Sequence, residues 1–367
     1  MKNMLQLQFK NFITLQRGFD LPKKDRVLGN YPVVASTAIN GYHAEHKVQP
    51  PGVVTGRSGS LGEVLYIDKP FWPLNTTLWV KDFIGNLPLY VYYFLKTLDL
   101  KKYNSGAGVP TLNRNHLDTL EIAIHDFQSQ RKIATTLSAY DGLIENNLRR
   151  IKILEEMAQT IYREWFVKFR FPGHEKIRVV DSPMGKIPEG WEVKKLGDVI
   201  ELAYGKGLKK TDRIEGNVPV YGSSGVLGYH ITRLVNGPGI IVGRKGNVGS
   251  VHWSNSDFFP IDTVFYVKTK LSLYYVFYNF QTQNFINADA AVPGLSRNQA
   301  YLLSFLVPPY TIVEQFEEMI KPFFALGIKM KDKIEVLKQT RDLLLPKLIS
   351  GELDVSDLDI KTGGHVQ

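Results

Sequence analysis

The chain has 367 residues, of which 44% are hydrophobic, so it has room for two or three domains with ordinary cores and is not a disordered protein. Its net charge is +9, of which residues 1–126 carry +4 (14 basic, 10 acidic) and residues 171–310 carry +4 (15 basic, 11 acidic), which suits two polyanion-binding units or simply a basic protein. The absence of cysteine excludes disulfides, thiolate chemistry and Cys-based zinc sites and fits the reducing cytoplasm.

Residues 1–126 form a first block, and much of this block is repeated later in the chain. PGVVTGRSGSLG at residues 51–62 matches PGIIVGRKGNVG 187 positions further on. Further matched groups are Asp25-Arg26 with Asp212-Arg213, Gly41-Tyr42-His43 with Gly228-Tyr229-His230, and Val109-Pro110 and Arg114 with Val292-Pro293 and Arg297. So many ordered matches predict that one block is present twice.

Each block is predicted to be mixed and rich in short strands. In the first block we expect strands at 53–54, 78–81 and 120–124 and a helix at 87–98. The second block has corresponding strands at 240–242, 264–268 and 304–307 and a helix at 272–284. Both apolar helices are too short to cross a bilayer, and the N-terminus lacks a signal-peptide pattern, so we expect a cytoplasmic protein with no membrane partner.

A long helix is predicted to begin after the first block, at 127–170. The run contains one glycine, Gly142, and its apolar residues recur every three or four positions. Asp126 can cap its start and Pro172-Gly173 can end it. At ~1.5 Å per residue, such a helix is about 60 Å long and must bury its apolar stripe against another rod.

The second long helix is predicted at 311–349. Thr311 with Glu314 forms a capping box, and Pro322 either kinks the helix or marks its true start. Arg341 interrupts the apolar stripe. The simplest arrangement is an antiparallel coiled coil of the two long helices. The alternative is that they are two unrelated surface helices.

The predicted fold is therefore α+β with a pseudo-two-fold internal repeat. Two similar strand-rich domains, 1–126 and 171–310, are separated by the long helices, and 350–367 forms a tail. The second domain begins with a linker ending in Pro188-Glu189-Gly190-Trp191, for which the first block has no equivalent. We expect the tail to occupy the matching place, which would bring the two ends of the chain together.

The repeated glycine turns are the strongest local signal for function. They are Gly56-Arg57-Ser58-Gly59 and Gly243-Arg244-Lys245-Gly246. Glycine allows a tight turn, so the basic side chains between the glycines can project at a phosphate or a guanine edge. An ordinary β-turn is the alternative, and the spacing fits neither a Walker loop nor the dinucleotide fingerprint.

Other residues join these turns as candidate nucleic-acid contacts because they recur in both blocks. The full candidate set is Lys23, Lys24, Arg26, Tyr42, His43, Arg57, Ser58, Arg114, Lys209, Lys210, Arg213, Tyr229, His230, Arg244, Lys245, Asn247 and Arg297. The alternatives are partly buried packing for the Tyr-His pairs, internal ion pairs for the two later arginines, and a solvated face for the lysine clusters.

No catalytic constellation is found. Val307-Pro308-Pro309-Tyr310 is one residue away from the Asn/Asp-Pro-Pro-Tyr motif of amino-methyltransferases, but valine cannot accept a hydrogen bond from a target amino group. We interpret it as a junction between a strand and the second long helix. Neither a metal-ligand cluster nor a nuclease carboxylate–lysine set is present, so we expect no metal.

The alternation of two repeated globular blocks with two long helices resembles the specificity subunit of type I restriction–modification systems. The resemblance covers essentially the whole chain. The stretches that carry the resemblance are residues 130–166 (QRKIATTLSAYDGLIENNLRRIKILEEMAQTIYREWF), 185–202 (GKIPEGWEVKKLGDVIEL) and 343–355 (LLLPKLISGELDV). The resemblance implies that the blocks are target-recognition domains, each reading half of a bipartite, asymmetric DNA site. It also implies that the helices set the spacer and dock two modification subunits.

The resemblance further implies a non-catalytic chain without a cofactor. S-adenosylmethionine and adenine methylation would belong to the modification partners, and motor-nuclease subunits would translocate and cut unmodified DNA. The first 17 residues depart from the family pattern because they are shorter than its usual lead-in. The alternatives are a stand-alone methyltransferase, a coiled-coil scaffold without a DNA role, or a specificity polypeptide of a related type II system.

Overall fold

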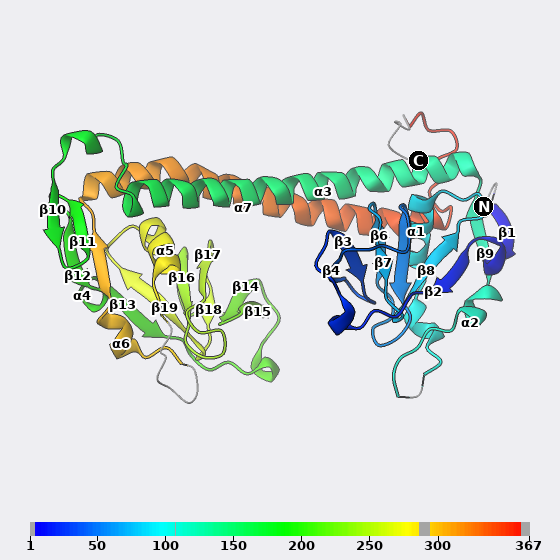
Figure 1. Cartoon of the computed structure of the whole chain (residues 1–367), viewed down its shortest axis with the longest axis horizontal. Helices are drawn as coiled ribbons and strands as arrows, with labels where there is room; N and C mark the ends of the chain where they lie inside the picture. The colour runs from blue at the N-terminus through cyan, green and yellow to red at the C-terminus, as the bar shows by residue number, and fades with distance from the viewer. Residues whose placement is uncertain (1–3, 107, 286–293, 361–367) are drawn as a thin grey trace. The chain divides into compact units, whose positions relative to one another are not determined.

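The computed structural model describes residues 4–106, 108–285 and 294–360 and divides into two compact units (Figure 1). Unit 1 comprises residues 1–146 and 333–367, and unit 2 comprises residues 147–332. Two long helices contribute to both units: α3 (Phe127–Tyr162), which continues as a π-helical turn over Arg163–Val167, and α7 (Tyr310–Ile349). The predicted domain boundaries therefore lie at the helix starts, whereas each compact unit includes its share of both helices.

Unit 1 is built on two small sheets and a strand pair. The first sheet is antiparallel, in the order β2 (Thr14–Arg17), β8 (Thr77–Asp82), β5 (Gly52–Gly56) and β6 (Val64–Ile67). The second has the order β4 (Ile39–His43), β3 (Tyr31–Val34) and β7 (Trp72–Pro73), and β1 (Met4–Gln8) pairs with β9 (Glu121–His125). The helices are α1 (Pro88–Thr97), α2 (Arg114–Asp118) and the short 3-10 turns η1 (Phe9–Asn11), η2 (Lys23–Asp25) and η3 (Leu100–Tyr103).

Unit 2 repeats this topology. Its first sheet has the order β13 (Ile200–Tyr204), β19 (Val264–Thr269), β16 (Gly239–Gly243) and β17 (Val251–Ser254). Its second sheet has the order β15 (Gly225–His230), β14 (Val218–Gly222) and β18 (Phe259–Pro260). The pair β12 (Glu192–Lys195) and β20 (Ser304–Val307) corresponds to β1 and β9. The helical elements are α4 (Leu196–Val199), α5 (Leu273–Thr282), α6 (Arg297–Tyr301), η5 (His174–Lys176) and η6 (Lys210–Asp212).

The α+β fold and the internal repeat are thus confirmed. The hairpin β10 (Val179–Ser182) and β11 (Gly185–Pro188) of the linker has no counterpart among the described residues of unit 1. In unit 2 the hairpin is followed by β12, and β1 is the equivalent of β12 in unit 1. Part of the lead-in is therefore present in the first block. The predicted match at Val292-Pro293 lies outside the described residues.

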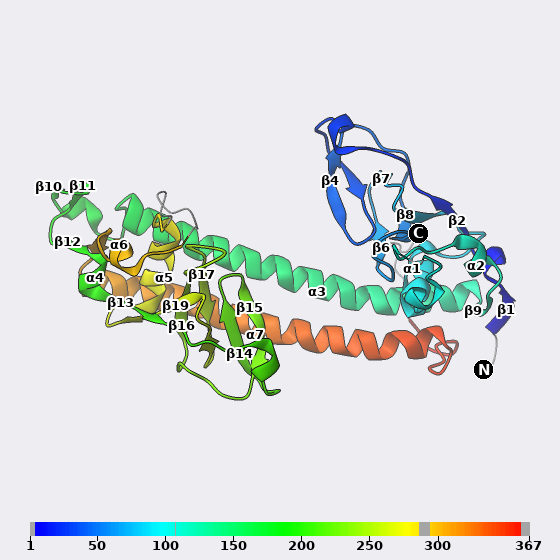
Figure 2. The ribbon, with the colours of Figure 1, turned by 90° about the horizontal axis from the view of Figure 1, so that it is seen from below.

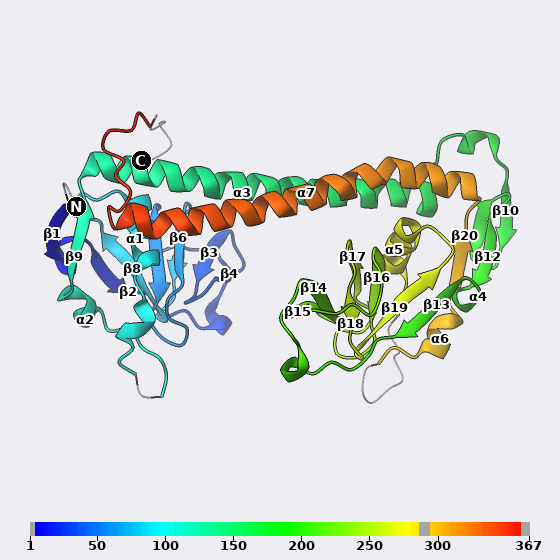
Figure 3. The ribbon, with the colours of Figure 1, turned by 180° about the vertical axis from the view of Figure 1, so that it is seen from behind.

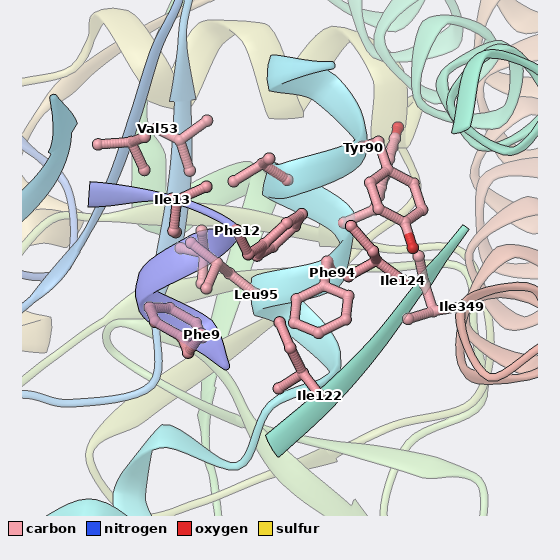
Figure 4. Packing of buried hydrophobic residues seen from close by; sticks show 14 of the residues in the cluster. Phe9, Phe12, Ile13, Val53, Tyr90, Phe94, Leu95, Ile122, Ile124 and Ile349 are labelled. Carbon is pink, nitrogen blue, oxygen red and sulfur yellow. The ribbon is translucent and has the colours of Figure 1, made fainter. Parts of the chain in front are cut away.

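Each unit has its own core, in which aromatic side chains pack among aliphatic ones. In unit 1, α1 lies between the first sheet and β9 (Figure 4). Phe12, which follows η1, packs against Phe94 of α1 with ring centroids 4.8 Å apart. In unit 2, Phe166 packs against Tyr275 and Phe316 at 4.8 and 4.9 Å. The long helices therefore form part of each core.

Segments of α3 and α7 pack together in opposite directions within each unit. Ile133 near the start of α3 shares a buried cluster with Leu348 near the end of α7 in unit 1. Tyr162 at the end of α3 contacts Phe316 near the start of α7 in unit 2. The antiparallel helix pair is thus confirmed.

The helix ends follow the prediction in part. The Asp126 carboxylate accepts a hydrogen bond from the Ser129 amide over 2.9 Å, as a capping residue does. Gly351 follows the second helix with a φ of +73°. The capping box at Thr311 is wrong, because α7 begins one residue earlier and the amides of its first turn bond to the Pro309 carbonyl. Pro322 does not mark the true start, since α7 runs through it.

The buried stripe differs from the predicted one at three places. The three- and four-residue spacing of apolar positions in the sequence predicts Leu148, Met319 and Leu326 on the stripe, but their side chains are 53%, 43% and 44% exposed. Asn147 and Ile320 are buried beside them instead. Because 3.6 residues per turn do not match a strict heptad, the stripe drifts by one position over several turns. The long helices therefore retain exposed apolar side chains.

The tail closes unit 1 at the start of the described chain, as expected. A Cβ on Gly351 would lie 2.9 Å from the Met4 sulfur. The His125 ring nitrogen Nε2 is 2.9 Å from the Leu348 carbonyl oxygen, and Lys132 donates to the Ser356 carbonyl over 2.6 Å. Val355 is 4% exposed and belongs to the core of unit 1.

Candidate nucleic-acid interface

The two glycine turns are built identically at the ends of β5 and β16. The amides of Arg57 and Ser58 donate to the Thr76 carbonyl over 2.8 and 3.1 Å. Those of Arg244 and Lys245 donate to Thr263 over 2.9 and 3.0 Å. Because these N–H groups are satisfied internally, the turn does not offer a backbone cradle for a phosphate. What it presents is its basic side chains.

A second arginine follows in each unit, at the first residue of a short helix. The Leu112 amide donates to the Arg57 carbonyl over 2.8 Å, and the Leu295 amide donates to the Arg244 carbonyl over 2.9 Å. These bonds hold the segment before α2 or α6 against the glycine turn. Arg114 is thereby brought beside Arg57, and Arg297 beside Arg244.

In unit 1 the paired arginines line a surface groove with a volume of about 680 Å³. Arg57 Nη1 donates to the Asn75 carbonyl over 3.0 Å, and Arg114 Nη1 donates to the Leu15 carbonyl over 3.3 Å. Other polar residues that line the groove are Arg17, Asp20, Ser105, Asn113 and Asn115. The groove offers donors and acceptors of several kinds around three arginines and one carboxylate.

In unit 2 the paired arginines lie against one tyrosine. The guanidinium carbons of Arg244 and Arg297 lie 5.2 and 4.8 Å from the centre of the Tyr204 ring. Tyr204 is 48% exposed and occupies the position that Arg17 has in unit 1. Cation–π contacts hold the guanidinium groups flat, and their buried Nε atoms have no hydrogen-bond partner within the described residues.

The arginines of these pairs have no direct carboxylate partner among the described residues, although Asp20, which forms an ion pair with Arg17 over 3.5 Å, also lines the groove of unit 1. Within the part of the chain that the structure describes, no carboxylate forms an ion pair with Arg57, Arg114, Arg244 or Arg297, so the internal ion pairs considered above are not formed. Two like charges held together without a directly bonded counter-charge raise the energy of the unliganded state. The arrangement is suited to an anion or to an electron-rich base edge.

The remaining candidates form a second group around β4 and β15. Lys23, Lys24, Lys209 and Lys210 are exposed. The side chains of Tyr42 and Tyr229 are 53% and 58% exposed. Arg26 and Arg213 each donate to a carbonyl of the adjacent strand.

His43 and His230 are not part of the candidate surface, contrary to the prediction. Their side chains are buried, and each Nδ1 lies 3.0 Å from the backbone nitrogen that donates to it, that of Val27 or Ile214. Neighbouring residues of a strand point to opposite sides, so the tyrosine of each Tyr-His pair is exposed and the histidine packs inside. The alternative of a packing role holds for both histidines.

The other turn residues differ between the units. Ser58 and Lys245 form equivalent β-bridges, with Thr111 and Gly294, but Ser58 is half-buried whereas Lys245 and Asn247 are exposed. The Asn247 amide donates to Ser223 Oγ over 3.3 Å, which leaves its side chain on the surface.

The sequence comparison of the two blocks missed Arg17 and Tyr204. A signal was present in the glycines that follow them, Gly18 and Gly205, which stand 187 positions apart. A Cβ on either would lie 2.2 or 2.1 Å from a carbonyl oxygen of the adjacent chain, so both positions require glycine. Among the described residues, no group of three or more His, Asp or Glu side chains is arranged to hold a metal ion, and no helix is long and apolar enough to cross a membrane.

The duplicated fold and the matching arginine pairs define a protein of two repeated domains with equivalent cationic surfaces. The family model described as "Type I restriction modification DNA specificity domain" matches residues 6–156 and again residues 188–337. The chain therefore belongs to this family of type I restriction–modification specificity proteins.

Individual relatives agree with this assignment. The type I restriction enzyme MjaIX specificity subunit of Methanocaldococcus jannaschii is 26% identical over 321 residues, which are 78% of this chain and 74% of that protein. The MjaVIII specificity subunit of the same organism is 31% identical over 132 residues, 35% of this chain and 30% of its own length. The crystal structure of the type I restriction–modification S subunit from M. genitalium has a TM-score of 0.61 at 18% identity, covering 95% of this chain and 96% of that one, which establishes the fold.

Proposed function

We propose that this chain is the non-catalytic subunit that selects the DNA sequence of a type I restriction–modification complex, and that it acts in the cytoplasm. In this proposal unit 1 and unit 2 each read one half of a bipartite site. The observation that carries it is the repeated pair of arginines without carboxylate partners, Arg57 with Arg114 and Arg244 with Arg297.

The two half-sites are expected to differ in sequence, because the surroundings of the arginine pairs differ. Arginine pairs with the O6 and N7 atoms of guanine, and asparagine pairs with the N6 and N7 atoms of adenine. Unit 1 places Arg17 and Asn113 beside its arginines, whereas unit 2 has Tyr204 and Ser296 at the equivalent positions, and both of its arginines contact the Tyr204 ring. Different side chains at equivalent places favour an asymmetric target.

The long helices are proposed to set the spacer between the half-sites and to dock two modification subunits. In unit 2, α3 exposes Leu148, Ile153 and Met157, which are 53%, 47% and 44% exposed. In unit 1, α7 exposes Val336 and Leu343, which are 61% and 68% exposed. Apolar side chains repeated along a helix suit a partner that covers them.

The chemistry in this proposal belongs to the partners. The modification subunits would bind S-adenosylmethionine and methylate adenines, and restriction subunits, where present, would supply DNA translocation and cleavage. The chain's own contribution would be the choice of sequence and the distance between the half-sites.

The test is to co-express the chain with its modification partner and to map methylated adenines by long-read sequencing. The expected result is methylation at two different short sequences separated by a gap of constant length. Methylation at a contiguous palindrome, or at no defined sequence, would contradict the proposal. A catalytically inactive modification subunit provides the control for background methylation.

A further inference from the structure

Each unit carries a projecting segment that the arginine pairs do not explain. We call it the tip: residues 23–28 with β4 in unit 1, and residues 209–215 with β15 in unit 2. In unit 1, β4 lies on the side away from α3 and α7 (Figure 2). In unit 2, β15 is likewise separated from the long helices (Figure 3). Among the described residues, the tip strand of each unit is paired on one side only, with β3 or β14.

The tip of unit 1 is held rigidly by two side chains. Arg26 Nη1 donates to the Asn40 carbonyl over 2.5 Å, and the Val27 amide donates to His43 Nδ1 over 3.0 Å. Gly41 has a φ of +93°, and a Cβ there would lie 3.6 Å from Arg26 Nη1. These contacts fix the turn against the strand.

The tip of unit 2 has the same construction. Arg213 Nη1 donates to the Leu227 carbonyl over 2.9 Å, and the Ile214 amide donates to His230 Nδ1 over 3.0 Å. Gly228 has a φ of +141°, and a Cβ there would lie 3.2 Å from Arg213 Nη1. The same support is therefore built twice, which argues that it serves a function common to both units.

What both supports present is a set of exposed apolar side chains. Val27 and Ile214 are 61% and 62% exposed, and Ile39 and Val226 are both 47% exposed. Tyr42 and Tyr229, noted above, complete the set. Isolated exposed apolar residues are common, but three matched positions on two rigid supports indicate a surface that a ligand covers.

The charges beside these side chains indicate which ligand. Lys23 and Lys24 flank the apolar residues in unit 1, and Lys209 and Lys210 flank those in unit 2. Within the described residues none of these lysines forms an ion pair. Apolar side chains that enter a DNA groove and lysines that bind the flanking phosphates are a combination that DNA-bending and groove-binding proteins use.

We propose that each tip makes a second contact with DNA, in which the apolar side chains enter a groove and the lysines bind phosphates. This inference rests on the proposed function and adds to it a contact that is largely apolar. It predicts two kinds of contribution to the binding free energy of the complex. The contribution of the arginine pairs and lysines falls as the salt concentration rises, and that of the apolar side chains does not.

The test uses the complex of the full chain with its modification partner, bound to a duplex that contains the mapped target. A triple variant, Val27→Ser, Ile39→Ser and Tyr42→Ser, is compared with the double variant Lys23→Gln and Lys24→Gln. We expect the apolar variant to weaken binding about tenfold, as a lost base contact does, without changing the slope of log Kd against log salt. The lysine variant is expected to reduce that slope by about 2, at ~0.9 per phosphate contact.

Two controls make the result specific. Val179→Ser with Val180→Ser removes exposed apolar side chains of β10 and is expected to leave DNA affinity unchanged, since these valines lie outside both tips. The triple variant of unit 2, Ile214→Ser, Val226→Ser and Tyr229→Ser, repeats the test independently and protects it against misfolding of one unit, which thermal unfolding would reveal.

Two outcomes would overturn the inference. Folded tip variants that bind the target like the wild type would show that the tips do not contact DNA. Variants that no longer copurify with the modification partner would show that the tips dock a protein instead. Both outcomes leave the proposed function intact, whereas a wild-type complex that selects no DNA sequence would refute the proposed function itself.

Discussion

Arg341 of α7 donates a hydrogen bond to Asp141 of α3 over 2.6 Å, and Tyr93 of α1 donates to the other oxygen of the same carboxylate over 2.5 Å. Arg341 interrupts the apolar stripe of α7 because it faces this carboxylate inside unit 1. The position equivalent to Asp141 in unit 2 is Phe324, which packs edge-on against Trp253 at 5.0 Å. The same place in the repeat thus holds a charged network in one unit and an aromatic cluster in the other.

Removing the Asp141 carboxylate should destabilise unit 1. In Asp141→Ala the partly buried Arg341 and Tyr93 lose their acceptor, and we expect the free energy of unfolding to fall by about 1–3 kcal/mol. Asp342→Ala is the matched control, because it removes the more exposed partner of Arg341, for which we expect a change within about 0.5 kcal/mol. Equal unfolding temperatures for the two variants would mean that the network contributes no stability.

The Asp126 cap should make the stability of unit 1 depend on pH. The Ser129 amide, which donates to this carboxylate, lowers the pKa of Asp126 in the folded protein. A lowered carboxyl pKa contributes stability that is present above the unfolded value of about 3.9 and is lost as the pH falls through the folded value.

Asp126→Ala should therefore unfold more easily by about 1 kcal/mol at neutral pH, and less so in acid. Thermal unfolding of the variant and the wild type between pH 7 and pH 2.5 measures the difference. Glu121→Gln, at an exposed carboxyl of β9, is the control. A difference that stays constant down to pH 2.5 would exclude the charged cap as its cause.

Replacing one arginine of a pair should change only the half-site that its unit reads. We expect Arg57→Gln to relax the base preference of one half and Arg244→Gln that of the other, each at a cost of about 1–3 kcal/mol in discrimination. Methylome mapping of each variant with the modification partner measures this. Arg233→Gln is the control because Arg233 forms an ion pair with Asp257 over 3.1 Å, and its motif should be unchanged. Loss of both halves in a single-arginine variant would contradict separate reading by the two units.

Lengthening both long helices together should widen the gap without changing the bases read. Insertion of seven residues after Asn146 in α3 and seven after Asp332 in α7 keeps the helix faces in phase and adds ~10 Å, which is about three base pairs. The mapped motif is expected to keep both halves and to gain a longer spacer. The same insertion in α3 alone breaks the pairing of the helices and should abolish methylation. An unchanged gap in the double insertion would rule out the helices as the spacer.

Local patterns predicted the elements well where one residue decides the boundary. Asp126 fixes the start of α3, and the predicted helices at 87–98 and 272–284 correspond to α1 and α5 within about two residues. The Val-Pro-Pro-Tyr segment is the predicted junction, since β20 ends at Val307 and α7 begins at Tyr310.

The features that could not be predicted from the sequence depend on contacts between residues far apart in the chain. The strand pairing of β2 with β8 joins residues more than 60 positions apart, and no local pattern records it. The inward direction of His43 follows from its bond to Val27, which the sequence does not show. Arg17 and Tyr204 share a place but not a side-chain type, so only the matched glycines that follow them, Gly18 and Gly205, indicate their positions in the sequence.

The contact of Gly351 with Met4 has a consequence for how the gene product can be rearranged. Since Gly351, which follows α7, packs beside Met4 of β1 in unit 1, we expect that a linker from the tail to β1 would preserve this contact while new ends are opened at the exposed turn between β10 and β11. Such a circular permutant would start with the second recognition domain and keep every strand pairing. In such a permutant the order in which the two halves are translated would change while the strand pairings within each unit stay the same.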